Sequence, residues 1–419
     1  MTSEIAILNT GAVALAADSA VTISGVQKVY HSARKLFKLS DAHAVGIMIY
    51  GNASFLDVPW ESIIEVYRKH IGDNCFDTLE AYTKSFFDFL HENDYPDLMS
   101  KSSEKNFLTN GLESEVINLH KALVDIKNNL FSEYGELHLQ QEIQDMYMYQ
   151  VGEFLQNSVS DYIKKSHIGA INEDDFNMLA EKYGPDIERM IEKHFEPYNF
   201  TAEWVGHIKL IVINVLLKEF SSKFSGIVFT GFGEKEIYPS FFLFLVDGCI
   251  NQKVKFWNTP QSKSINHARK ASIIPLAQRD MVNSFFEGIH PGMENLLKNN
   301  LNKNAQLLQH SFNKIIDTQL AGKVDKESVK EEIKAEILHL YDDHVKTMIN
   351  FKQEQFIDPM MTIVENLPKE ELAEMAETLI HLTSFKNRLS TDVESVGGPV
   401  DSAVITKADG FVWVRNKTE

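Results

Sequence analysis

The chain has 419 residues, of which 44% are hydrophobic, so it can bury a full core and its length suggests two or three domains. Its 41 basic and 59 acidic residues give a formal charge of −18, which argues against nucleic acid and anionic membranes as partners. Two cysteines, Cys75 and Cys249, make no disulfide framework in a chain of this size, which favours a reducing compartment.

Targeting signals are not evident in the sequence. The most apolar run, residues 241–246, stops at Asp247 and falls far short of the ~18 to 20 residues that span a bilayer. The first residues lack the basic and then apolar pattern of a signal peptide. We therefore expect a cytoplasmic protein with no membrane partner.

The first fifty residues are typical of β-structure. Residues 5–8 and 12–16 flank a short turn at Asn9-Thr10-Gly11, which predicts a hairpin. Further strands are expected at 26–30, 36–39 and 44–50. From about residue 60 to 220 the apolar spacing becomes helical.

A second β block is predicted from residue 226 to 247, followed by strands at 253–257 and 271–274. Residues 276–390 read as helices with breaks near 290–292, 321–322 and 358–359. The last helix starts near Pro368, and its apolar stripe runs from Leu372 to Phe385. A hairpin at 401–406 and 411–414 closes the chain.

Runs of strands separated by runs of helices predict the α+β class. The arrangement we expect is a four-layer αββα sandwich of two antiparallel sheets with two large helical insertions. The predicted divisions are residues 1–59, 223–290 and 367–419 for the core, with mostly inserted helices at 60–222 and an inserted helical segment at 291–366.

Three parts of the sequence resemble a known family. The first part begins with Thr2 at the head of the first strand and continues with Gly11 to Asp18. The second part is Ala33-Arg34-Lys35-Leu36-Phe37. The segment from Gly397 to Phe411 continues the similarity after a helix. Together with the middle β block, these parts resemble the β-subunits of the proteasome and the peptidase subunit of a bacterial ATP-dependent protease. The resemblance implies an N-terminal-nucleophile hydrolase and leaves the two helical insertions unexplained.

The chemistry of such a hydrolase starts at Thr2, which becomes the N-terminal residue when Met1 is removed. A threonine hydroxyl needs a base, and an N-terminal residue supplies its own α-amine, with an ordinary pKa of about 7.7 to 8.0. Lys35 is the candidate cation that keeps this amine neutral, and Asp18 the carboxylate that orients Lys35.

The resemblance also implies roles for three further residues. Asp392 and Ser395 have the D-x-x-S spacing that orients the nucleophile's amine and a water, although one extra residue separates Ser395 from Gly397 and Glu394 fits in another register. Gly51, at the end of the strand after the lysine, would supply the backbone N–H of an oxyanion hole. No cofactor and no metal is implied.

Each of these residues also has an ordinary interpretation. Asp18 alone fits a turn, and Lys35 fits a solvated lysine on an edge strand. If Lys35 is catalytic, we expect Lys35→Ala to remove most activity and leave the fold intact, because alanine at a strand edge costs little stability. His339 and His344 are five apart, which puts them on different faces of a helix and favours a solvated surface over a zinc site.

The leading functional hypothesis is a threonine peptidase or amidohydrolase that cleaves peptide bonds. Two alternatives stay open: an inactive scaffold subunit that binds partners, and an amidase for a small amide. The expected partners are a peptide or protein substrate and further copies of the chain in a homo-oligomer. Because no phosphate-binding glycine loop with Gly-Lys-Ser or Gly-Lys-Thr is present, any ATPase or regulatory partner would be a separate chain.

Overall fold

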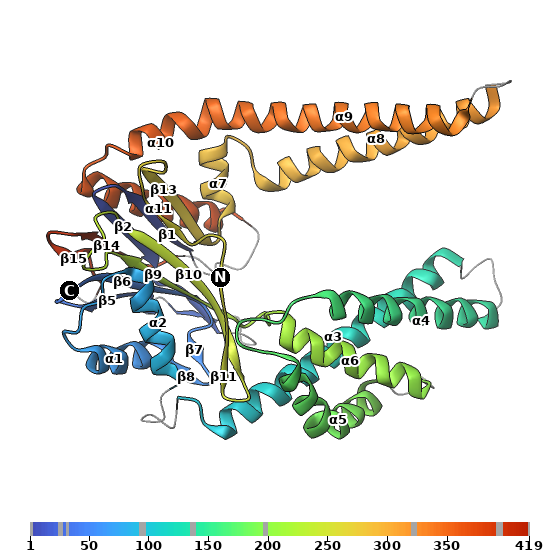
Figure 1. Cartoon of the computed structure of the whole chain (residues 1–419), viewed down its shortest axis with the longest axis horizontal. Coiled ribbons are helices and arrows are strands. Elements are labelled where there is room, and N and C mark those ends of the chain that lie inside the picture. Colours follow the sequence, from blue (N-terminus) through green and yellow to red (C-terminus); the bar gives the residue numbers. More distant parts are fainter. Residues whose placement is uncertain are drawn as a thin grey trace. The chain divides into compact units, whose positions relative to one another are not determined.

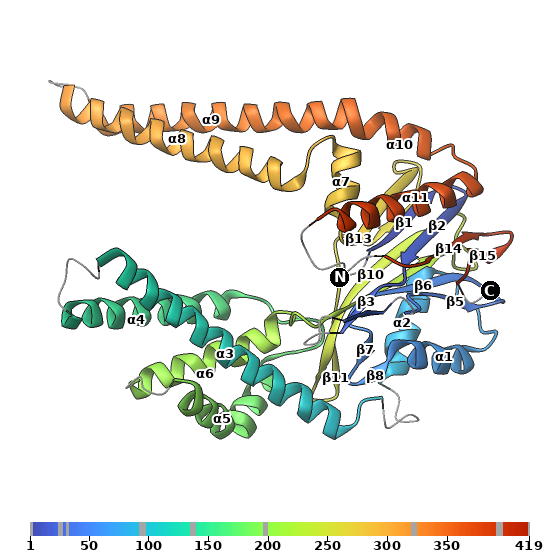
Figure 2. The same cartoon turned by 180° about the vertical axis from the view of Figure 1, so that it is seen from behind.

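The computed structural model describes residues 3–23, 28–30, 33–91, 98–134, 140–195, 200–319, 325–390 and 397–417. The chain divides into two compact units, whose elements are labelled in Figure 1 and seen from behind in Figure 2. We call them the terminal unit, which comprises Met1–Leu36, Ile237–Pro239 and Ser264–Glu419, and the central unit, which comprises Phe37–Glu236 and Ser240–Lys263.

The terminal unit is built on an antiparallel sheet with the strand order β13-β1-β2-β14-β15. Its strands are β1 (Ser3–Asn9), β2 (Ala12–Asp18), β13 (Ala271–Ala277), β14 (Val400–Thr406) and β15 (Gly410–Arg415). A separate hairpin joins β3 (Val21–Ile23) to β4 (Lys28–Tyr30). The two ends of the sequence thus share one sheet, in which β2 pairs with β14.

The hairpin of β1 and β2 confirms the prediction for the first residues. Ile5 lies opposite Ala16, and the Asn9 side chain holds the turn by accepting the N–H groups of Gly11 and Ala12, each at 3.0 Å. The Asn9 amide also donates to the Leu367 carbonyl at 2.9 Å. Asn9 therefore connects the turn to the segment just before the last helix.

Helix α11 (Lys369–Arg388) packs against β1, β2 and β14. Its buried apolar residues include Leu372, Ala376 and Ile380, which contact the alanine-rich face of β2 in one hydrophobic cluster. Small alanines let the helix approach the sheet closely. The predicted stripe is wrong at its end, because Phe385 is 58% exposed and the buried face continues through Thr383 and Ser384 instead.

The remaining helices of the terminal unit form a long hairpin and its connections. They are α7 (Asp280–Glu287), α8 (Pro291–Gln319), α9 (Lys326–Lys352), the π-helical turn η1 (Gln353–Ile357) and α10 (Asp358–Val364). Figures 1 and 2 show α8 and α9 side by side. Large apolar side chains on both are exposed, among them Leu307, Leu308, Phe312, Leu338 and Phe351.

The predicted break at Asp358-Pro359 is wrong, because the chain stays helical from α9 into α10. A proline ring collides with the carbonyl four residues earlier in a regular α-helix. The wider π-turn at η1 lies directly before Pro359, where it relieves that collision.

The central unit contains a second sheet, with the order β11-β10-β9-β6-β5. Its strands are β5 (Leu36–Ser40), β6 (His43–Gly51), β9 (Ser225–Gly231), β10 (Ser240–Ile250) and β11 (Lys253–Asn258). The pairings of β10 with β9 and β11, and of β9 with β6, are antiparallel. Short strands β7 (Ser54–Phe55), β8 (Val58–Pro59) and β12 (Lys263–Ser264) complete the β-structure.

Two aromatic-rich helices, α1 (Trp60–Ile71) and α2 (Leu79–Leu90), cover one face of this second sheet. Phe86 of α2 lies 5.1 Å from Phe229 of β9, measured between ring centroids. The Trp60 indole N–H donates to the Ser225 hydroxyl at 2.9 Å, which satisfies the one polar atom of that buried side chain.

The other helices of the central unit form a bundle with its own hydrophobic cluster. They are α3 (Lys101–Tyr134), α4 (Gln140–Lys164), α5 (Glu173–Phe195) and α6 (Ala202–Lys218). Phe107 of α3 contacts both this cluster and the cluster beneath α1 and α2. The bundle and the second sheet are therefore packed together within one unit.

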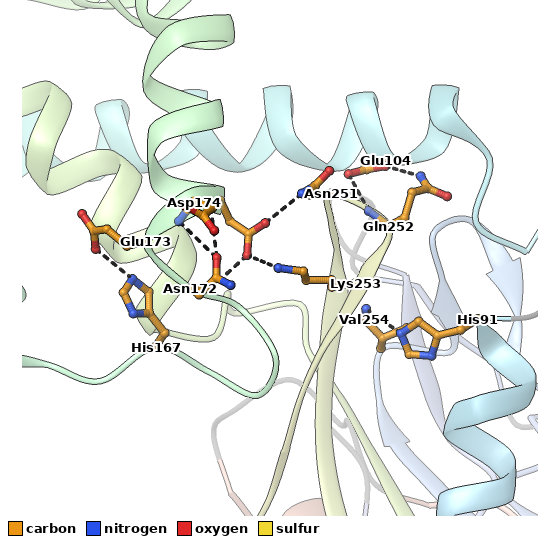
Figure 3. Close-up of polar contacts among 11 residues, drawn as sticks. His91, Glu104, His167, Asn172, Glu173, Asp174, Asn251, Gln252, Lys253 and Val254 are labelled. Atoms are coloured by element: carbon orange, nitrogen blue, oxygen red, sulfur yellow. Dashed lines mark hydrogen bonds and ion pairs between the residues drawn. The ribbon is translucent and has the colours of Figure 1, made fainter.

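A polar junction joins the bundle to the turn between β10 and β11, as Figure 3 shows. The Asp175 side chain is fully buried and accepts hydrogen bonds from Asn251 at 3.0 Å and from Lys253 at 2.8 Å. Glu104 of α3 accepts from the Gln252 side chain at 2.5 Å. Burial alone favours the neutral form of Asp175, but these bonds outweigh it and hold the pKa of the carboxyl below its ordinary value.

We expect Asp175→Asn to lower the free energy of unfolding by about 2 kcal/mol at pH 7, because the variant loses a charge-assisted bond and misplaces a donor. A folded-state pKa below the ordinary value of about 3.9 means that the stabilisation is present above that pH and is lost as pH falls further. Urea unfolding at pH 7 and pH 2 measures both effects. The matched control is Asp174→Asn, an exposed neighbour that should change neither; equal losses in the two variants would contradict the assignment.

The α+β class, with two antiparallel sheets and large helical segments, is confirmed. The division into core and inserted ranges stays a prediction. Within the described ranges, no helix has the length and apolar character that a membrane crossing requires.

Candidate active site

Asp18 is the centre of a buried polar cluster in the terminal unit. It is the last residue of β2, and its side chain is fully buried. Its Oδ1 atom accepts the Lys35 ammonium at 2.5 Å and the Ser3 backbone N–H at 3.0 Å, while Oδ2 accepts the Gly397 N–H at 3.0 Å. Asp18 is thus a satisfied carboxylate and not a turn residue.

Lys35 lies between two carboxylates. Besides Asp18, its Nζ atom lies 3.4 Å from Glu4 Oε1, and the side chains of Lys35 and Glu4 are 6% and 0% exposed. The segment before β5 is fixed by the Ala33 N–H, which donates to the Ser19 carbonyl at 3.2 Å, and by Lys417, which donates to the Ala33 carbonyl. The interpretation of Lys35 as a solvated edge lysine is therefore wrong.

Three predicted site residues, Thr2, Asp392 and Ser395, lie outside the described residues. Two residues near them in the chain donate backbone hydrogen bonds to Asp18. Ser3 follows Thr2 directly, and Gly397 lies two residues after Ser395. The pairing of β2 with β14 places Val400 opposite Asp18, so the segment that leads into β14 passes this carboxylate. The roles of Thr2, Asp392 and Ser395 stay predictions.

Gly51 ends β6 in the central unit, where it pairs with Ser225. Its φ is +81°, and a Cβ at this position would lie 2.5 Å from the Phe224 carbonyl oxygen, so the backbone requires glycine here. This local requirement explains the residue without an oxyanion hole. A role for Gly51 as an oxyanion donor stays a prediction.

Sequence reasoning missed Glu4 and the two backbone donors. Glu4 lies in the otherwise apolar interior of β1, opposite Ala17, and a charged residue in such a run is the signal that points to a buried partner. The N–H groups of Ser3 and Gly397 belong to the backbone, so the type of side chain at these positions could not predict their hydrogen bonds to Asp18. Their contacts depend on how β1 and β14 flank β2.

The cluster brings one lysine and two carboxyl groups together in a buried site. If Glu4, Asp18 and Lys35 are all ionised, its formal charge is −1, so the effect on a neighbouring group depends on which of the three is nearest. Lys35 cannot move freely, because Asp18 and Glu4 both hold its ammonium. The arrangement holds the Lys35 ammonium at a fixed position beside β1, between two carboxylates.

Elsewhere in the described part of the chain, no group of three or more histidine, cysteine or acidic side chains is arranged to hold a metal. His339 lies on α9, 3.4 Å from Asp343, with 69% of its side chain exposed.

Comparisons with known proteins give little. No protein-family model matches the sequence, and no curated protein is similar to it. Solved structures that resemble it include a Gly-1 mutant of Anbu from Hyphomicrobium sp. strain MC1, with 8% identity, a TM-score of 0.33, and coverage of 100% of this chain and 86% of that chain. Another is Anbu (ancestral beta-subunit) from Yersinia bercovieri, with 9% identity, a TM-score of 0.31, and coverage of 99% and 88%.

These findings correct the family assignment made from the sequence. Both of these structures are Anbu proteins, a proteasome-like but distinct family. Both TM-scores are below 0.5, so neither structure supports an argument about this chain. No family model matches the sequence, so the resemblance of Gly11 to Asp18 and of Gly397 to Phe411 to proteasome β-subunits does not establish membership in that family.

Proposed function

We propose that the form of this chain that begins at Thr2 hydrolyses amide bonds of peptides, with the Thr2 hydroxyl as nucleophile and the Thr2 amine as general base. The observation that carries the proposal is the buried Lys35–Asp18 pair, whose carboxylate also binds the N–H of Ser3, the residue bonded to Thr2. A costly buried charge cluster one residue from a potential nucleophile favours a catalytic role over a structural one.

The reaction follows from these groups. The neutral Thr2 amine takes the proton of the Thr2 hydroxyl as its oxygen attacks the substrate carbonyl carbon. The ammonium then gives this proton to the leaving amine, and the C–N bond breaks to leave an ester on Thr2. Water then attacks the ester while the same amine takes a proton from it. The amine passes this proton to the Thr2 oxygen as the ester C–O bond breaks, which frees the acid product and restores the Thr2 hydroxyl. Lys35 favours the neutral amine electrostatically, and Asp18 positions Lys35.

The exposed apolar side chains of α8 and α9 support self-association as the working form, because a monomer rarely exposes this many large apolar residues on one element. A peptide or protein is the proposed substrate class. A separate ATPase partner was implied only by the family resemblance, and that support is now gone.

The decisive experiment compares two forms of the full chain, one beginning at Thr2 and one retaining Met1. In the second form the Thr2 nitrogen is an amide without a basic lone pair, so hydrolysis of fluorogenic peptides should occur only with the first. A peptide β-lactone should acylate the same form. The mass of the intact chain should show the adduct, and fragmentation should place it on the N-terminal segment. Equal hydrolysis by both forms would contradict the N-terminal mechanism.

A comparison of substrates separates peptidase from small-amide activity. A Thr2 form that takes up the β-lactone but cleaves only simple amides would retain the mechanism and reject peptides as substrates. A Thr2 form that neither reacts nor hydrolyses would contradict the proposed enzyme and leave the scaffold alternative.

A further inference from the structure

The central unit contains a cavity of about 510 Å³ whose lining includes many polar residues. One face of α3 forms a wall, the segment after α6 forms another, and the turn between β7 and β8 contributes the rim. All of these elements belong to the same unit. The proposed hydrolysis uses none of them.

The floor of the cavity is held by a buried ion pair. The side chains of Lys255 and Asp247 are each 1% exposed, and Lys255 Nζ donates to Asp247 Oδ2 at 3.0 Å. Asp247 also accepts the Ser221 backbone N–H at 3.0 Å and the Ser221 hydroxyl at 2.5 Å. Lys255 donates as well to the Glu219 carbonyl. This network fixes the segment after α6 as a rigid wall.

The α3 wall carries a row of uncharged hydrogen-bonding side chains. Asn106, Asn110, Ser114 and Asn118 follow one another at intervals of four residues and line the cavity. Four residues of an α-helix rise about 6 Å, so these side chains form a line along one face. Asn106 and Asn110 are both exposed.

This spacing is close to the repeat of an extended peptide, in which every second residue recurs after about 6.6 to 6.8 Å. An asparagine amide has both a donor and an acceptor, as a peptide unit does. Asparagines at this interval, such as Asn106 and Asn110, can therefore pair with every second backbone amide of an extended chain. Phe107 and Phe220 add apolar surface at the same cavity.

The charges around the cavity favour a basic ligand. Four carboxylates line it, those of Asp57, Glu115, Glu219 and Asp247, against the two ammonium groups of Lys223 and Lys255. Asp247 forms an ion pair with Lys255, and Glu219 forms one with Lys165. Glu115 is half-buried beside the asparagine row, and burial raises the pKa of its carboxyl. A cationic side chain near Glu115 would offset that burial.

The rim has a strained conformation. Leu56 and Asp57, at the turn between β7 and β8, have φ values of 47° and 71°, which non-glycine residues rarely adopt. Such a turn is strained and persists where its surroundings hold it. Leu56 is buried in the hydrophobic cluster beneath α1 and α2, and this contact holds the exposed Asp57 at the cavity.

We propose that this cavity binds an extended basic peptide segment, whose backbone is held by Asn106 and Asn110 and whose lysine or arginine side chain contacts Glu115. The site lies on α3, within the helical segment that the family resemblance left unexplained. Binding at this site requires neither Thr2 nor hydrolysis. The inference therefore stands or fails separately from the proposed enzymatic activity.

Fluorescence anisotropy with the full-length Thr2→Ala chain tests the proposal without turnover. The probe is a fluorescein-labelled hexapeptide of alternating lysine and serine, compared with its glutamate counterpart and with a version methylated on its backbone nitrogens. We expect saturable binding of the lysine peptide and at least about tenfold weaker binding of the other two.

Variants locate the site. Asn106→Ala with Asn110→Ala should weaken binding about tenfold, and Glu115→Gln should weaken binding of the lysine peptide but not of an all-serine peptide. The matched control is Asn128→Ala with Asn129→Ala, two exposed asparagines on the same helix outside the cavity. Circular dichroism checks that each variant is folded. Equal losses in both pairs, full binding of the methylated peptide, or no saturable binding would each overturn the proposal.

Discussion

Replacement of Thr2 by alanine in the chain that begins at residue 2 should reduce peptide hydrolysis by at least about 10³-fold while the protein stays folded. The substitution removes the hydroxyl and leaves the amine, so the amine has no nucleophile to activate. Initial rates with a fluorogenic peptide measure the effect. Far-UV circular dichroism and thermal unfolding check the fold, which depends on contacts beginning at Ser3.

The matched control is Thr2→Ser, which preserves the hydroxyl and the amine and should retain part of the activity. Full activity in Thr2→Ala would exclude the nucleophile. Equal inactivity of the serine variant and the alanine variant would show that more than the hydroxyl is needed, and would favour the scaffold alternative if the β-lactone also fails to react.

Lys35→Ala should lower the free energy of unfolding by about 3 to 5 kcal/mol and abolish hydrolysis. The substitution leaves Glu4 and Asp18 as buried carboxylates without their shared cation, and removal of one partner of a buried pair is strongly destabilising. This differs from the expectation drawn from the sequence, in which alanine at an edge strand costs little. Chemical denaturation with a two-state fit measures the loss.

A triple variant separates stability from catalysis. Glu4→Gln, Asp18→Asn and Lys35→Met together remove all three charges, so no buried charge stays unpaired and most of the lost stability should return. Hydrolysis should not return, because the cation is absent. If activity and stability recover together, Lys35 has a structural role alone and the proposed mechanism is wrong.

The sequence predicted much of the fold because its local signals agree with one another. Asn9-Thr10-Gly11 marks a turn between two apolar runs, and the structure contains that hairpin. The helical spacing between residues 60 and 220 likewise corresponds to α1 to α6. Local patterns are less informative where a neighbour decides the outcome: Phe385 fits an apolar stripe by spacing but faces solvent, and Pro359 follows a π-turn that no residue pattern announces.

The candidate site was only partly predictable for a similar reason. Asp18 and Lys35 were expected to pair, and the structure joins them at 2.5 Å. The contact of Lys35 with a second carboxylate, that of Glu4, could be predicted only from the register of β1 against β2. The cavity beside α3 was missed altogether, because asparagines at intervals of four look like an ordinary solvated helix face until the opposite walls are known.

The ligands of Asp18 have a consequence for when the site can form during synthesis. Its carboxylate binds the backbone of Ser3 and of Gly397, and the contact with Gly397 spans 379 residues of sequence. At about 5 to 20 residues per second, a ribosome needs roughly 20 to 75 s to make that span. The Asp18 cluster therefore stays incomplete on the nascent chain until Gly397 has left the ribosome, so the proposed hydrolysis cannot begin before then.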